Sequence, residues 1–325
     1  MQLDPSRSYD VIGDVHGCAY TLEKLLDQLG YRLQRGVWQH PQRQVLFLGD
    51  IVDRGPNIRR ALHIVYNMVQ AGLAHCIMGN HEFYALAWHT LAPAGSSAVF
   101  VREHNARHQR LIQETHEQFL AYPKEWQQFI AWFADMPLFM EHTRCRLVHA
   151  YWDDELIKTL RCRFPEGRVD LAFLQQAAIP KSFARQVFNR LLRGINLPLP
   201  QGVSLTSEDG YTRGSFRSKF WQEDQPPQTY GDVVFQPDAL PEHVAQLPLP
   251  SRYKEFLASY DKTQPMLFVG HYWRQGQPQA LTTNVACLDY SAVQGGKLVA
   301  YRLDQETQLD DNKFVWVDVD RKDLA

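Results

Sequence analysis

Cysteine is scarce in this chain, no long apolar run occurs in it, and neither sign of charge predominates. The 5 cysteines are dispersed without a C-x-x-C pair, which is typical of reduced thiols in a cytosolic protein. A net charge of -2 gives no support for bulk electrostatic binding to nucleic acid or to a membrane surface. No apolar run approaches the length of a membrane span, and the N-terminal stretch M-Q-L-D-P-S-R-S-Y-D lacks an apolar signal region. We therefore expect a soluble, cytoplasmic protein without membrane or bulk nucleic-acid partners.

The stretch from Val45 to Pro56, V-L-F-L-G-D-I-V-D-R-G-P, combines a buried-strand pattern with a polar loop. Four apolar residues end at Gly49, so the pattern predicts a strand that delivers the following side chains to the mouth of a sheet. The delivered groups are two carboxylates, Asp50 and Asp53, and one guanidinium, Arg54. Carboxylates bind hard cations and arginine binds phosphate oxygens, so the stretch predicts a site that holds metal ions and a phosphoryl group together.

Three strand–loop–helix units follow one another at the start of the chain. Apolar strands are expected at Tyr9–Ile12, Val45–Leu48 and Ala74–Met78, each followed by a polar loop. Such a succession predicts parallel strands with right-handed crossovers. All three polar loops would then emerge on the same side of the sheet.

The rest of the chain is expected to contain two insertions and further strands. Aromatic residues at helical spacing predict a helical insertion at about 92–136, and a stretch rich in proline and glycine predicts a loop-rich insertion at about 153–262. Two strands around a turn are expected at Leu138–Glu141 and Arg146–Ala150, and another at Met266–Val269. The tail is expected to form a second, antiparallel sheet from Ala286–Tyr290, Lys297–Leu303 and Phe314–Val319. We interpret residues 1–325 as a single domain that carries the two insertions.

Six side chains suited to metal binding stand at or beside the ends of apolar runs. They are Asp14, His16, Asp50, Asn80, His149 and His271. Mixed carboxylate, amide and imidazole ligands suit manganese, iron or zinc better than magnesium or calcium. Asp50 is central enough to bridge two ions, and two ions about 3.5–4 Å apart would clamp a phosphoryl group and ionise a bridging water. The resulting hydroxide would attack phosphorus in line, while Arg54 neutralises the non-bridging oxygens.

Three blocks, G-D-V-H-G, G-D-I-V-D-R-G and G-N-H-E, resemble in order and spacing the signature of the calcineurin-like metallophosphoesterases. The V-D-R-G form resembles that of the phosphoprotein phosphatase branch, which includes bacterial symmetrical diadenosine tetraphosphatases. The likeness covers roughly the first ninety residues, with islands at His149, His271 and the tail. It implies an α/β fold of four layers, α/β/β/α, in which two mixed sheets are flanked by helices and insertions.

The resemblance also implies roles for individual positions. One ion would be held by Asp14, His16 and Asp50, and the other by Asp50, Asn80, His149 and His271. His81 would be the general acid on the leaving oxygen, oriented by Asp53, and Arg54 would bind phosphate. Glu82 is expected to brace the start of its helix rather than to bind metal.

The fourth and fifth blocks depart from the family pattern, because aromatic residues follow both histidines. These residues are expected to narrow the cleft or to stack on a substrate base, and they are Tyr151, Trp152, Tyr272 and Trp273. The phosphatase branch also uses a second phosphate-binding arginine, for which Arg217 is the first candidate and Arg213 the next. The segment around Asp289 resembles the tail of the diadenosine tetraphosphatases, so this carboxylate would be structural or would support the metal ligands.

The sequence therefore predicts a metal-dependent phosphoric ester hydrolase with two divalent ions, manganese first and iron or zinc as alternatives. Its activity would be serine/threonine protein phosphatase-like hydrolysis of phosphoproteins or small phosphoesters. An alternative is cleavage of a dinucleoside polyphosphate such as diadenosine tetraphosphate, since both reactions use the same metal core. A non-catalytic metal-binding scaffold is a further alternative, which is disfavoured because every expected ligand, the acid and the arginine are present.

Overall fold

The computed structural model describes residues 3, 4, 6–206, 212–221, 226–235, 240–254, 257 and 259–324. The chain forms two compact units, of which unit 1 comprises Met1–Arg193 with Pro265–Ala325 and unit 2 comprises Gly194–Gln264. Unit 2 begins within the loop-rich insertion expected at 153–262, whose earlier part belongs to unit 1. Among the described residues, no helix is both long and apolar enough to cross a membrane.

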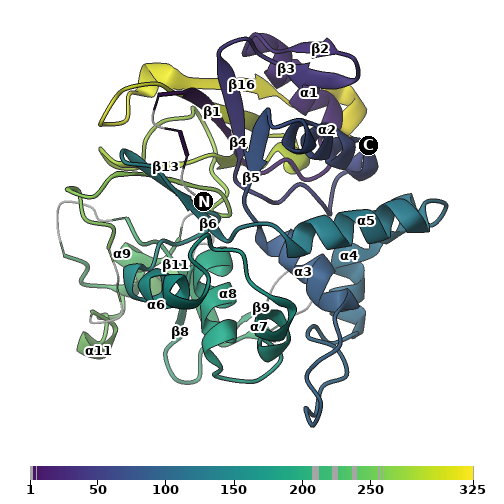
Figure 1. Cartoon of the computed structure of the whole chain (residues 1–325). Helices are drawn as coiled ribbons and strands as arrows, with labels where there is room; N and C mark the ends of the chain where they lie inside the picture. The colour runs from purple at the N-terminus through teal and green to yellow at the C-terminus, as the bar shows by residue number, and fades with distance from the viewer. Residues whose placement is uncertain are drawn as a thin grey trace. The chain divides into compact units, whose positions relative to one another are not determined.

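A six-stranded mixed sheet in unit 1 carries the three strands expected at Tyr9–Ile12, Val45–Leu48 and Ala74–Met78 (Figure 1). Its strands are β1 (Ser8–Ile12), β4 (Arg43–Phe47), β5 (Ala74–Cys76), β14 (Asp289–Tyr290), β15 (Lys297–Leu303) and β16 (Phe314–Asp318). The prediction of parallel strands is confirmed, because β1 pairs with β4 and β4 with β5 in parallel. Their polar loops consequently leave the sheet at one edge.

A second, four-stranded mixed sheet completes the two-sheet architecture of unit 1. Its strands are β6 (Phe139–Glu141), β7 (Cys145–Val148), β12 (Met266–Val269) and β13 (Val285–Cys287). β7, β12 and β13 are parallel to one another, whereas β6 is antiparallel to β7. The predicted α/β fold with two mixed sheets is confirmed.

The expectation that the tail strands form a sheet of their own is wrong. β15 pairs antiparallel with β1, and β14 and β16 both pair with β15, so these strands extend the first sheet. Only β13 joins the other sheet. The physical reason is that β1 would otherwise present an open edge, which the long and mostly buried strand β15 covers.

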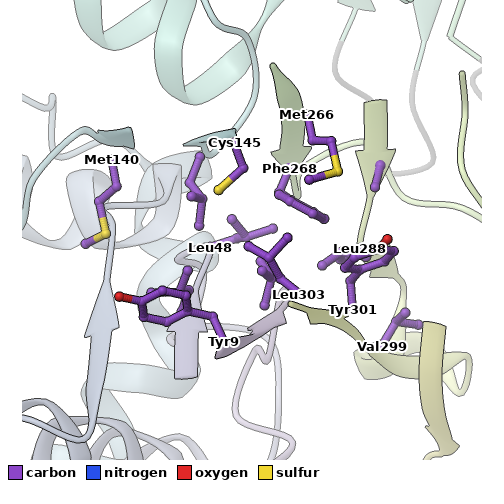
Figure 2. Packing of buried hydrophobic residues seen from close by; sticks show 14 of the residues in the cluster. Tyr9, Leu48, Met140, Cys145, Met266, Phe268, Leu288, Val299, Tyr301 and Leu303 are labelled. Atoms are coloured by element: carbon purple, nitrogen blue, oxygen red, sulfur yellow. The ribbon is translucent and has the colours of Figure 1, made fainter. Parts of the chain in front are cut away.

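The hydrophobic core of unit 1 lies between the two sheets (Figure 2). Side chains from one sheet, such as Leu46 and Leu48, meet side chains of the other, such as Leu147 and Phe268. Full burial of one such side chain stabilises the fold by about 1.5–3 kcal/mol. This packing fixes the ends of strands from both sheets relative to one another.

Helices cover the sheets of unit 1 and also build the first insertion. They are α1 (Ala19–Gln28), α2 (Ile58–Gln70), α3 (Asn80–His89), α4 (Ala106–Phe119), α5 (Pro123–Ala134), α6 (Asp154–Arg163), α7 (Leu171–Gln176) and α8 (Phe183–Arg193). α1 packs against β15 and β16, and α2 packs against β5 and α4 (Figure 1). Three 3₁₀ turns lie in the tail: η1 (Ala292–Gln294), η2 (Asp311–Lys313) and η3 (Arg321–Asp323). β2 (Arg32–Gln34) and β3 (Val37–Gln39) form an antiparallel hairpin.

Unit 2 is built from short strands and short helices. Its antiparallel pairs are β8 (Ile195–Pro198) with β11 (Ser215–Ser218) and β9 (Leu205–Thr206) with β10 (Thr212–Arg213). Its helices are α9 (Tyr230–Val233), α10 (Glu242–Ala245) and α11 (Ser251–Lys254). Phe216, Tyr230 and Val244 are buried within it.

Candidate metal centre and catalytic pair

The candidate ligands lie just beyond the carboxyl ends of strands from both sheets of unit 1. Asp14, Asp50 and Asn80 follow β1, β4 and β5, while His149 and His271 follow β7 and β12. Candidate ligand atoms form two groups, and within each group all atoms lie within 4.8 Å of one another. One group is His16, Asp50 and His81, and the other is Asp14, Asp50 and His149. Asp50 belongs to both groups, as a carboxylate that bridges two ions would.

Two imidazoles converge on one oxygen of Asp50. Its Oδ2 lies 3.3 Å from Nε2 of His149 and 3.5 Å from Nε2 of His16. Nδ1 of His149 donates to the Leu48 carbonyl at 2.8 Å, and Nδ1 of His16 donates to the Val52 carbonyl at 2.8 Å. Because a neutral imidazole carries one proton, these bonds leave both Nε2 lone pairs free to bind a metal.

The amide of Asn80 joins the remaining ligands. Its Oδ1 lies 3.1 Å from Nε2 of His149 and 2.7 Å from Nδ1 of His271. Exchanging the amide oxygen and nitrogen would turn both contacts into hydrogen bonds donated to the rings. With the oxygen in this place, the amide and both imidazoles present lone pairs to one another, an arrangement that a cation between them stabilises.

Asp14 provides the test of whether the site suits a metal ion. Its Oδ2 accepts the His271 backbone N–H at 3.1 Å, but its Oδ1 is buried and has no hydrogen-bond partner. Burial and the charges of Asp289 and Asp50 raise the pKa of Asp14 well above its usual value. An orphaned buried oxygen among carboxylates is costly unless a cation meets it. The residues therefore fit a divalent cation.

Glycines allow the loops to approach this closely. A Cβ added to Gly270 would lie 2.0 Å from Oδ1 of Asp14, and one added to Gly79 would lie 2.2 Å from Oδ1 of Asp50. Any larger residue at either position would displace a ligand carboxylate.

Left-handed backbone angles concentrate at this site. Positive φ values are found for His16 (43°), Asp50 (52°), Asp53 (66°), Arg54 (68°) and His271 (62°). Non-glycine residues adopt such angles at an energetic cost and are enriched at functional sites. The loops therefore hold these side chains in positions that a relaxed backbone would not give.

His81 and Asp53 form a buried pair beside the ligands. Nδ1 of His81 lies 2.7 Å from Oδ2 of Asp53, and the His81 ring stands edge-on to that of His16 at 4.7 Å. Burial raises the pKa of Asp53 to about 7 and lowers the pKa of His81 to about 3. When the pair carries two protons, one lies between Nδ1 of His81 and the Asp53 carboxylate, and the other is on Nε2 of His81.

A family match covers the part of the chain that carries most of these residues. Residues 8–184, more than half of the chain, match the family described as calcineurin-like phosphoesterase. The chain belongs to the calcineurin-like phosphoesterase family.

Curated relatives of this phosphoesterase match over a shorter stretch. The chain is 51% identical over 73 residues to the asymmetrical bis(5'-nucleosyl)-tetraphosphatase PrpE of Oceanobacillus iheyensis. The match covers 22% of this chain and 29% of that protein. The chain is 45% identical over 74 residues to the protein of the same name in Halalkalibacterium halodurans, covering 22% and 30%. The phosphoesterase thus spans less than a third of the length of these relatives.

Solved structures resemble the phosphoesterase over nearly its whole length. One is a putative diadenosine tetraphosphatase, with TM-score 0.47, 13% identity and coverage of 99% of this chain and 98% of that one. Another is a serine/threonine phosphatase from Saccharomyces cerevisiae, with TM-score 0.49, 15% identity and coverage of 97% and 80%.

Glu82 organises the loops of the phosphoesterase without pointing to a metal. Its carboxylate accepts the backbone N–H groups of Gly79 at 3.0 Å and of Asp50 and Ile51 at 2.8 Å. Because the N-cap residue Gly79 has no side chain, only the Glu82 half of a capping box forms at the start of α3, which agrees with the predicted bracing role of Glu82. This residue ties the Asp50 loop to the Asn80 loop.

Thr115 is a site residue that sequence reasoning missed. Its hydroxyl on α4 donates to Oδ1 of Asp53 at 2.5 Å and accepts the Asp53 backbone N–H at 3.1 Å. Thr115 is fully buried. A threonine in a polar helix has no signature in the sequence, and only the packing of α4 onto the Asp53 loop reveals it.

The substrate-binding candidates have separate outcomes. Arg54 is exposed, and its positive charge acts on His16, His81 and Asp53, so it stands at the site. Arg213 and Arg217 lie on β10 and β11 of unit 2, and their role stays a prediction.

The aromatic residues beside the histidines are buried rather than offered to a ligand. Tyr151 is 6% exposed, Trp152 is 2% exposed and Tyr272 is fully buried. Because a nucleobase can stack only on an accessible ring face, this burial counts against the stacking role expected for these three rings. Trp273 is partly exposed.

Proposed function

We propose that this chain is a dinuclear metal-dependent phosphoesterase, and that its ligands are Asp14, His16, Asp50, Asn80, His149 and His271. The observation that carries the proposal is the convergence of these side chains around Asp50, next to the His81–Asp53 pair and Arg54. Asp14, His16 and Asp50 would hold one ion, and Asp50, Asn80, His149 and His271 the other. Manganese is the first candidate, with iron or zinc as alternatives, because the ligand set mixes oxygen and nitrogen atoms.

Bound ions would ionise a water and neutralise the phosphoryl oxygens. Arg54 would bind the non-bridging oxygens of the phosphoryl group, as an exposed guanidinium beside the site can. His81 would give the proton on Nε2 to the leaving oxygen, and Asp53 would hold the ring in the required orientation from Nδ1. Arg217, with Arg213 next, stays the sequence-based candidate for a second phosphate-binding arginine.

Phosphomonoesters and dinucleoside polyphosphates both suit this core. Cleavage of a dinucleoside polyphosphate is supported by the two relatives named bis(5'-nucleosyl)-tetraphosphatase. Phosphoproteins and small phosphoesters remain the other substrate class, and the cytoplasmic location stays a prediction from composition. Turnover of a phosphopeptide, p-nitrophenyl phosphate and diadenosine tetraphosphate with manganese would rank these substrates.

His81→Asn tests the catalytic proposal. We expect turnover to fall by about 10²–10⁴-fold, since general acid catalysis contributes this much, while the metal content stays unchanged. His40→Asn, a substitution in the hairpin region away from these loops, is the matched control and should keep full turnover. Undiminished turnover of His81→Asn would exclude His81 as the acid, and a metal-loaded parent that hydrolyses none of the three substrates would favour the non-catalytic scaffold.

A further inference from the structure

A cavity of about 860 Å³ opens beside α3 in unit 1. Its walls come from α3, from the loop after α3 and from α8, and include Tyr84, Phe100, Arg102 and Arg193. The volume falls in the range of roughly 300–1,000 Å³ that is usual for small-molecule sites. The mechanism proposed above uses none of these residues.

The cavity begins next to the proposed acid. Tyr84 follows His81 by one turn of α3, and the two rings meet edge-on at 5.6 Å. The guanidinium of Arg102 covers the Tyr84 ring at 3.7 Å and acts through its charge on both His81 and Asp53. The backbone N–H of Arg102 donates to the Ala87 carbonyl at 3.1 Å, which fixes this loop on α3.

Three arginines, Arg102, Arg185 and Arg193, give this cavity a positive wall, and Arg185 donates to the carbonyls of Ala177 and Ala178. Arg102 lies close enough to Arg193 for their charges to repel, and neither forms an ion pair with a carboxylate in the described part of the chain. The guanidinium of Arg193 donates instead to Oδ1 of Asn189 at 3.2 Å. Glu103 is the single carboxylate among the described lining residues. It is exposed, and its Oε2 accepts a hydrogen bond from the side-chain amide of Asn105. Guanidinium groups that line one cavity without a carboxylate ion-pair partner suit the binding of an anion such as phosphate.

Aromatic rings line the same cavity. Phe100 stacks on His104 at 4.0 Å, and His104 stacks on Trp88 at 3.8 Å, with interplanar angles of 13° and 11°. Phe100 is the end ring of this stack and is partly exposed in the cavity wall. A planar base placed on Phe100 would extend the stack by one ring.

We propose that this cavity binds the leaving group of the reaction, and that the leaving group is a nucleotide. Its phosphates would lie at Arg102 and Arg193, and its base would lie on Phe100. Hydrolysis forms one bond between water oxygen and phosphorus and breaks the bond from phosphorus to the leaving oxygen. That oxygen takes the proton of His81, so the departing nucleotide is released on the His81 side, one helical turn of α3 from the cavity wall at Tyr84. This inference rests on the proposed phosphoesterase function and specifies its substrate.

Binding of two non-hydrolysable probes to the full chain with manganese tests the cavity directly. Adenosine 5′-(α,β-methylene)diphosphate carries base and anion, whereas methylenediphosphonate carries the anion alone. By calorimetry, the parent should bind the nucleotide about tenfold more tightly than methylenediphosphonate, as stacking of one base provides. Arg102→Gln and Arg193→Gln should each lower the affinity for both probes about fivefold, because each substitution removes charge-assisted hydrogen bonds to the anion.

Two further variants separate the base from the anion. Phe100→Leu should lower the affinity for the nucleotide probe and leave the affinity for methylenediphosphonate unchanged. Arg321→Gln, an exposed substitution on η3, is the matched control and should bind both probes as the parent does. Equal affinity of the parent for the two probes would contradict base binding, and unchanged affinity in both Arg102→Gln and Arg193→Gln would contradict the anion site.

Kinetics then place the cavity on the leaving-group side. The ratio of kcat/KM for diadenosine tetraphosphate to that for p-nitrophenyl phosphate should fall about tenfold in Arg193→Gln and Phe100→Leu. A parent that hydrolyses p-nitrophenyl phosphate but not diadenosine tetraphosphate would overturn the leaving-group assignment and leave the phosphoesterase intact. Absence of turnover on every phosphoester would instead reject the proposed function, whatever the two probes show.

Discussion

Single residues decide how the proposed acid is held. His81 depends on Asp53 for its orientation, and Asp53 in turn depends on Thr115 from another helix. The Thr115 hydroxyl lowers the pKa of Asp53, against the opposing effect of burial. Thr115 therefore positions the pair without touching substrate.

Thr115→Val should lower kcat about tenfold, since one charge-assisted hydrogen bond to the carboxylate is lost. Removing this bond raises the pKa of Asp53 above about 7, so the corresponding limb of the pH–rate profile should move to higher pH. Thr115→Ser restores the hydroxyl and should recover both values. A purely structural role is indicated if Thr115→Val is less active with an unshifted profile.

Gly270→Ala should remove metal from the centre. The added methyl would fall on Oδ1 of Asp14, which cannot move without losing its place among the ligands. We expect the bound metal per chain, measured by elemental analysis, to drop by about half or more, with activity falling in parallel. Gly276→Ala, where an added Cβ meets no atom within 4 Å but φ is 83°, controls for the loss of a flexible glycine. Full metal occupancy in Gly270→Ala would contradict the ligand role of Asp14.

At the scale of elements, the first insertion is bound to the frame by an ion pair. Arg59 on α2 binds Glu125 on α5 through two nitrogens at 2.8 and 2.9 Å, and His63 on α2 approaches the same carboxylate at 3.0 Å. These contacts join α2 to α5, and both of these helices pack against α4, which carries Thr115. The bond to Arg59 lowers the pKa of Glu125 to about 2, with burial opposing it and His63 adding to it.

Glu125→Gln should destabilise the protein by about 0.2–1 kcal/mol at pH 7, the usual range for a partly exposed pair. Because the folded pKa lies below the unfolded value, this stabilisation is complete above about pH 4.5 and is lost as the pH falls toward about 2. Urea unfolding of parent and variant should therefore give midpoints that differ at pH 7 and converge in acid. Glu155→Gln, on α6, is the control, and an equal difference at all pH values would refute the assignment.

Elements near the start of the chain are predictable because their signals are local. The apolar patterns of β1, β4 and β5 are sufficient by themselves to place Asp14, Asp50 and Asn80 at one sheet edge. Asn57 stands at the start of α2, yet its side chain donates to the Lys322 carbonyl and to Asp323 instead of capping the helix. The tail turn that captures it lies too far along the chain for local pattern to reveal.

At the scale of the whole molecule, packing decides what the local pattern leaves open. The antiparallel partner of β1 is β15, a strand almost three hundred residues away. The apolar pattern of β15 does not indicate which strand it pairs with. Tyr272 and Tyr151 are expected from the sequence to face a ligand but are buried. The nucleotide cavity likewise joins α3, a loop and α8, so neither Arg102 nor Phe100 stands out in the sequence.

The ligands belong to both sheets, so metal should stabilise the molecule as a whole. Manganese at about one hundred times its Kd should add about 2.7 kcal/mol, which corresponds to a rise in Tm of about 4–5 °C for a chain of this length. Calorimetric scans with manganese and with a chelator should show this difference. Asp50→Asn, which removes the shared carboxylate, should abolish most of the increment, and a Tm independent of metal would contradict binding by residues of both sheets.

The left-handed backbone at Arg54 lowers the thermal stability of the protein. Its side chain is exposed, so removing it sacrifices little packing, and a left-handed non-glycine residue costs about 1–2 kcal/mol. Arg54→Gly should therefore raise Tm slightly while turnover falls, measured on the same preparation. Selection for thermal stability alone would favour glycine at this position. We infer that arginine is retained because its proposed phosphate-binding role outweighs the stability that it costs.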